Sequence, residues 1–113
     1  MEPLIENFDK LIRGTKSGQI TWTRLNNLTY VWQTKNAAVK RLNVILQRIK
    51  VASGNDGILF RLFNVEAKSV ILDIRTERTT SDVKAKMFEL YQIIESSFES
   101  GKIDILSDLL KDI

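Results

Sequence analysis

The stretch that decides the fold is residues 37–65, which read AAVKRLNVILQRIKVASGNDGILFRLFNV. Residues 37–52 are ambiguous, because their apolar side chains include some at helical spacing while five of them are β-branched. Residues 55–57, Asn-Asp-Gly, follow at once and are typical of a hairpin turn. Residues 58–65 are apolar at most positions, as in an interior strand. We therefore predict a strand in residues 37–52, with a helix as the alternative.

Upstream of this stretch the sequence predicts one helix and two strands. Apolar residues at positions 4, 5, 8, 11 and 12 lie on one stripe of a helix, and Gly14 is a natural stop. Apolar and polar residues alternate in residues 20–23 and again in residues 28–33, as in half-buried strands. Asn26 and Asn27 lie between the two runs and are typical of a turn.

Downstream the pattern returns from strand to helix. Residues 69–75 alternate as a further strand, and residues 81–100 carry an apolar stripe at helical spacing. Gly101 is a candidate stop, so a short final helix is expected over residues 104–113. The chain, residues 1–113, is thus predicted to be a single α+β domain. It would have an N-terminal helix, an antiparallel meander sheet of about five strands, and one long and one short C-terminal helix packed on one face.

The composition excludes most catalytic classes. The chain has no His and no Cys, so the commonest general base, the thiolate nucleophile and the sulfur metal ligands are missing. No run approaches the roughly 18 apolar residues of a membrane-spanning helix, and the first residues lack the basic and apolar regions of a signal peptide. We expect a cytoplasmic, non-enzymatic protein that needs no cofactor or metal and has no membrane partner.

Charge is placed unevenly along the chain. The net charge is only +3, but residues 10–55 carry nine basic residues and no acidic one, whereas residues 56–113 carry eight basic against eleven acidic residues. Trp22, Tyr30 and Trp32 lie within the basic segment. Basic side chains interleaved with aromatic rings are what an acidic protein or a nucleic-acid strand would contact.

This pattern predicts a small binding or regulatory module that engages an acidic partner protein, with nucleic-acid binding through the same segment as the alternative. The binding residues expected from the sequence are Arg24, Trp32, Lys35, Lys40, Arg41, Arg48 and Lys50. The competing interpretation is structural. In it, opposite charges cancel across the folded surface, and the aromatic residues belong to the core.

Two further signals are weaker. Glu66, Ala67 and Lys68 match the E-x-K element of metal-dependent nucleases, with Asp56 upstream as a second carboxylate, but such short strings are common by chance. Residues 103–113 are more apolar than a short terminal helix needs. They are expected to pack on the protein's own sheet, with a homodimer through the C-terminal helices or a regulatory partner as the alternative.

Overall fold

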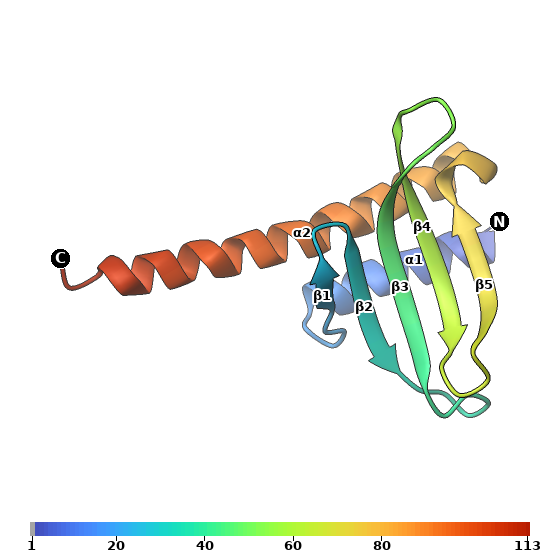
Figure 1. Ribbon diagram of the computed structural model, residues 1–113, viewed down its shortest axis with the longest axis horizontal. Coiled ribbons are helices and arrows are strands. Elements are labelled where there is room, and N and C mark those ends of the chain that lie inside the picture. The colour runs from blue at the N-terminus through green and yellow to red at the C-terminus, as the bar shows by residue number, and fades with distance from the viewer. Residues whose placement is uncertain (1) are drawn as a thin grey trace.

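The computed structural model describes residues 2–113 and consists of helices packed on a five-stranded sheet (Figure 1). The elements in chain order are α1 (Glu2–Lys16), β1 (Thr23–Asn26), β2 (Thr29–Thr34), β3 (Leu42–Lys50), β4 (Asp56–Asn64), β5 (Ser69–Arg75), the short 3-10 helix η1 (Thr76–Arg78) and α2 (Ser81–Leu110). Each strand pairs antiparallel with the next, so the sheet is a meander in the order β1-β2-β3-β4-β5. The predicted α+β class is confirmed.

The centre of the sheet is the pair of strands β3 and β4. They are in register from Leu42 opposite Asn64 to Lys50 opposite Asp56. The ambiguous residues 37–52 thus contain a strand, as predicted, because β-branched side chains favour extended backbone. In the first half of β3 every second side chain is buried, which is the period of a strand with one face on the core.

The turn between β3 and β4 lies earlier than the prediction for residues 55–57. Gly54 has a φ of 86°, in the left-handed region, and its N–H donates to the carbonyl of Val51 at 2.8 Å. Gly57 is instead buried inside β4. A Cβ at this position would come within 2.8 Å of the Thr76 hydroxyl oxygen, so a strand passes here only because the residue has no side chain.

Both α-helices cover the same face of the sheet, as predicted (Figure 1). Phe8 of α1 meets Phe60 of β4 edge to face, with ring centroids 5.0 Å apart. Leu46 of β3 and Leu90 and Ile94 of α2 lie in the same buried cluster. Burial of each such side chain stabilises the fold by roughly 1.5–3 kcal/mol. The core therefore lies in a single layer between the sheet and the helices.

α1 continues past its predicted stop at Gly14. The helix ends at Lys16, and the residue that turns the chain is Gly18, whose φ of 82° lies in the left-handed region. Gly14 has a different role, because a Cβ there would lie 2.7 Å from the side chain of Ile20. Its missing side chain allows the segment after α1 to fold back against the helix.

α2 is one continuous helix, so the prediction of a separate short helix at the C-terminus is wrong. The helix begins after Thr80, whose hydroxyl accepts a hydrogen bond from the Val83 N–H at 3.5 Å. It then passes through Gly101 without a break, because this glycine does not adopt the left-handed conformation that ends a helix. Neither α1 nor α2 carries an apolar run that could cross a bilayer.

The end of α2 projects beyond the sheet (Figure 1). Every residue from Glu99 to Ile113 is exposed, including several large apolar side chains. The expectation that these residues pack on the protein's own sheet is therefore wrong. We call residues 99–113 the projecting segment.

The position of the core makes a prediction for stability. Leu46 is fully buried, so Leu46→Ala should lower the free energy of unfolding by about 2–5 kcal/mol, from lost burial and the cavity left behind. Leu109 is 74% exposed, and Leu109→Ala should change the stability of the monomer by no more than about 0.5 kcal/mol. Urea titrations followed by circular dichroism measure both values. Equal effects of the two variants would contradict the described core.

Candidate functional site: a basic end beside an apolar cavity

The nine basic residues of the segment 10–55 do not gather on one face. Lys10, Arg13 and Lys16 lie on α1, and the other six lie on or beside strands β1 to β3. β3 has nine residues and spans about 30 Å, so the strand keeps Arg41 and Lys50, at its two ends, far apart. The segment therefore forms several separate positive regions.

Arg24, Arg48 and Lys50 belong to the end of the sheet that holds the β1–β2 turn, and each has a contact within the chain. Arg24 donates to Asn26 and Asn27 of its own turn, at 3.4 and 3.2 Å. Lys50 forms an ion pair with Asp56, the residue opposite it on β4, and this ion pair lowers the pKa of the Asp56 carboxyl.

Arg48 faces the helices rather than solvent. Its guanidinium carbon lies 5.1 Å from the centre of the Tyr91 ring on α2, within the range of a cation–π contact. Its Nε is buried, and the described residues offer it no hydrogen-bond partner. This arginine is held against the core, so we do not place it on a partner-binding surface.

Lys35, Lys40 and Arg41 are brought together at the opposite end of the sheet, in the connection between β2 and β3. All three are exposed, and they line a shallow hollow of about 440 Å³. We call them the basic end. None of the ion pairs between the described side chains, those of residues 3–113, involves them.

The loop that carries the basic end is held by local hydrogen bonds. The side-chain oxygen of Asn36 accepts from the N–H groups of Ala38 and Val39, at 2.9 and 2.7 Å. The Asn36 N–H in turn donates to the Val39 carbonyl at 3.0 Å. The Val65 N–H donates to the Arg41 carbonyl at 3.0 Å and ties this loop to the β4–β5 turn. The three cations are thus presented by a fixed backbone.

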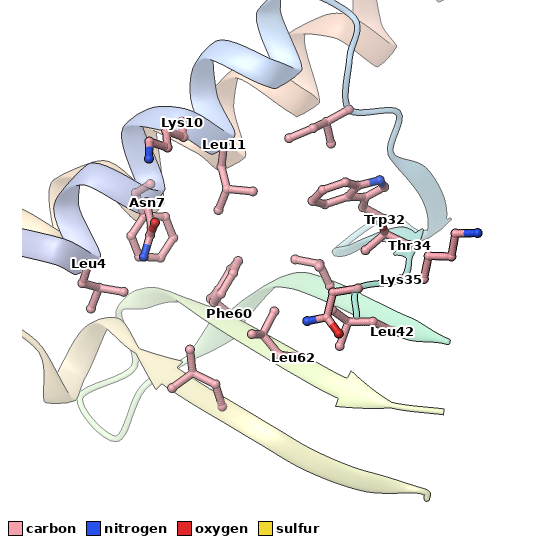
Figure 2. A pocket seen from close by; sticks show the side chains of 15 residues that line it. Leu4, Asn7, Lys10, Leu11, Trp32, Thr34, Lys35, Leu42, Phe60 and Leu62 are labelled. Atoms are coloured by element: carbon pink, nitrogen blue, oxygen red, sulfur yellow. The ribbon is translucent and has the colours of Figure 1, made fainter. Parts of the chain in front are cut away.

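An apolar cavity of about 450 Å³ lies between α1 and the sheet, next to the basic end (Figure 2). We call it the α1 cavity. Its walls are mainly the apolar side chains Leu4, Phe8, Leu11, Ile20, Trp32, Leu42, Val44, Phe60, Leu62 and Leu72. The cavity and the basic hollow share Thr34, Lys35 and Leu42 as lining residues. An apolar recess and a positively charged rim therefore adjoin each other.

The rim of the α1 cavity carries a second cation that the sequence analysis did not select. Lys10 of α1 and Lys35 after β2 both line the cavity and come from opposite walls, as Figure 2 shows. Asn7 stands one turn before Lys10 on the same helix. The sequence did contain a signal for Asn7 and Lys10. Both flank the apolar stripe of α1, so their side chains lie at the edge of the surface that this stripe packs against.

The aromatic residues of the basic segment are mostly core. Trp22 is buried, and its indole N–H donates to the Thr15 hydroxyl at 3.0 Å. Tyr30 is buried against Tyr91, with ring centroids 5.4 Å apart. Only Trp32 is half-buried and lines the α1 cavity. Within the basic segment the structure thus offers one partly open ring, whereas a single-stranded nucleic acid needs several stacking faces.

The E-x-K element is not assembled into a metal site. Glu66 lies in the β4–β5 turn, whereas Asp56 begins β4 at the other end of that strand. Nine strand residues, about 30 Å, separate the two carboxylates. Among the side chains that the structure describes, those of residues 3–113, no group of three or more carboxylates is close enough to hold a metal ion.

The chain matches no known protein family, and neither the curated proteins nor the solved structures contain a match to it.

The buried tyrosines make a prediction for pH. Burial raises the pKa of both Tyr30 and Tyr91, the only tyrosines of the chain, above the ordinary value of 10.0. Folding thus favours the neutral phenol. The contribution of the two phenols to the free energy of unfolding is fully present below pH 10.0. It is lost as the pH rises through the higher pKa that these groups have in the folded state.

A spectrophotometric titration of phenolate absorption should show both tyrosines ionising above the range of free tyrosine. Denaturation in urea should return both to the ordinary range. Ionisation of either ring near pH 10.0 in the folded protein would contradict its burial between α2 and the sheet.

Proposed function

We propose that the protein is a non-catalytic binding module that engages an acidic partner protein through the basic end and the α1 cavity. The observation that carries the proposal is the shared border of the two features, formed by Thr34, Lys35 and Leu42. A partner segment with an apolar side chain beside carboxylates would satisfy both at once, because the side chain leaves water while the carboxylates meet cations.

The basic end and the α1 cavity would contribute differently to binding, because they differ in exposure. The basic end is exposed, so its ion pairs with a partner are screened by salt and mainly raise the association rate. The α1 cavity is apolar and includes Trp32, so it supplies the anchor that slows dissociation. Specificity would come from the requirement that a partner present both.

An acidic protein fits these surfaces better than a nucleic acid. The α1 cavity has the size of pockets that hold small groups, and its walls offer apolar contact rather than base-edge hydrogen bonds. Arg24, Arg48 and Lys50, which a long polyanion would have to reach together with the basic end, are held at the other end of the sheet. We retain nucleic acid as the alternative that the binding assay distinguishes.

We also propose that the chain self-associates through the projecting segment of α2. This segment exposes large apolar side chains that no other described part of the chain covers. Exposed apolar patches of this kind mark sites of interaction.

The proposal predicts how the affinity for an acidic peptide responds to charge removal. The probe is a fluorescently labelled peptide of Glu, Leu and Phe, and its control is the same peptide with Lys in place of Glu. Removing the three exposed cations in Lys35→Ala, Lys40→Ala and Arg41→Ala together should weaken binding about tenfold at low salt, since each exposed pair contributes roughly 0.5 kcal/mol. Fluorescence anisotropy measures the affinity.

Lys50→Ala is the matched control, because Lys50 is an exposed cation at the far end of β3 and should leave the affinity unchanged. Leu72→Glu places a carboxylate on the wall of the α1 cavity and should also weaken binding, whereas Leu25→Glu, on β1, should not. Equal loss in the Lys50 variant would refute the basic end as the site. Tight, steeply salt-dependent binding of oligothymidylate instead of the peptide would favour nucleic acid.

A further inference from the structure

The projecting segment carries its apolar side chains on a different face of α2 from the core residues. Positions seven apart share a helix face. Met87 and Ile94 are buried, and they are followed at this spacing by Gly101 and Asp108. Tyr91 and Phe98, which also pack on the core, are followed at this spacing by Ile105, which lines a hollow beside Trp22, and then by Asp112. The face that packs on the sheet therefore becomes mostly polar beyond Ile105.

A new apolar face begins on the side of α2 that points to solvent. We call it the seam, and its residues are Ile103, Leu106, Leu110 and Ile113. They recur at steps of three, four and three, and each is between 49% and 101% exposed. The residues seven positions before Ile103 and Leu106 are Ser96 and Glu99, which are polar and exposed. The seam therefore does not continue the core stripe of α2. The body of the same chain packs on another face of α2, so it cannot cover the seam.

We infer that two copies of the chain pair through the seam with their helices antiparallel. Ile103 of each copy lies opposite Ile113 of the other, and Leu106 lies opposite Leu110. This inference rests on the proposed self-association and specifies its geometry. Steps of three and four are the spacing of paired helices, and this register sets every seam side chain against an apolar one.

The length of the overlap fits the shape of the chain. Residues 103–113 pair over about 16 Å, taking helical rise throughout. Ile113 follows the last helical turn and is tied to it by a hydrogen bond from its N–H to the Leu110 carbonyl, at 3.1 Å. Pairing begins only after α2 has left the sheet (Figure 1), so in this register the body of each copy lies beyond Ile113 of the other.

The placement of charge favours a second copy over a basic partner. By helical spacing, Asp104, Asp108 and Asp112 fall on the side of the helix away from the seam. The edges of the seam carry Ser107 on one side and Leu109 on the other. An antiparallel pair therefore brings no carboxylates together, and like charges across an interface would oppose association. A basic partner would need carboxylates beside the seam, and the one that stands there, Glu99 at its start, is already paired with Lys102 at 3.0 Å.

The exposed apolar area is sufficient for a specific pair. The seam together with Leu109 at its edge offers on the order of 500 Å² per copy, given the area that one such side chain buries. Two copies would then bury about 1,000 Å², the lower end of specific interfaces. The dimer should therefore form reversibly, at micromolar concentrations and above.

The experiment uses the full chain and light scattering coupled to size exclusion, from micromolar to millimolar concentrations. The native protein should shift from 13.0 kDa toward twice that mass as its concentration rises. Leu106→Lys and Leu110→Glu should each raise the dissociation constant at least tenfold. Mixed in equal amounts, they should recover the dimer, because the antiparallel register sets position 106 of one chain against position 110 of the other.

Asp108→Asn, on the outward side, is the matched control and should leave the dimer intact. The seam residues are exposed in the single chain, so circular dichroism should show unchanged helix content in all variants. Dimerisation without recovery in the mixture would overturn the antiparallel register while leaving self-association in place. A constant mass of 13.0 kDa would overturn both, and binding to lipid vesicles by that monomer would assign the seam to a membrane surface. Neither result affects the acidic-peptide assay, which tests the basic end.

Discussion

The antiparallel pairing of β3 with β4 is the constraint on which the rest of the structure depends. It fixes the alternation of side chains, so that Leu46 and Phe60, directly opposite each other, both face the helices. α1 and α2 can then bury their stripes on that face alone. Since the helices cover only this face, the α1 cavity lies at the border of the helix layer, between α1 and the sheet.

The same pairing explains why a basic stretch of sequence does not become a basic surface. Neighbours in sequence are carried to opposite ends of a long strand, and successive residues of a strand point to opposite faces. Arg48 and Lys50, two residues apart on the same face of β3, are each held by a contact within the chain: Arg48 lies against Tyr91, and Lys50 pairs with Asp56 across the hairpin. The basic residues that do form a cluster are those in the loop between β2 and β3. Lys35, Lys40 and Arg41 lie outside the strands, so strand alternation does not separate them.

Much of the fold could be predicted from the sequence, because the strands depend on local backbone preferences that follow from the type and spacing of their side chains. β-branched side chains and the turn residues that follow them identified the central strand in residues 37–52. The glycines were harder, because a glycine stops a helix only when it takes the left-handed conformation. Gly18 and Gly54 do so, whereas Gly14 and Gly101 are helical, and composition does not distinguish the two cases.

The candidate site was only partly predictable, and the two halves of α2 show why. A helical stripe says which residues share a face but not what covers that face, since the cover is supplied by residues far away in sequence or by another molecule. In α2 the stripe moves to a new side between Ile94 and Ile103, and that shift was present in the sequence. The shift of the apolar stripe can be interpreted only once the structure shows that α2 leaves the sheet between these two residues. The apolar residues that follow are exposed in the single chain, because the core packs on the other side of α2, and this exposure is what supports the proposed pairing with a second copy.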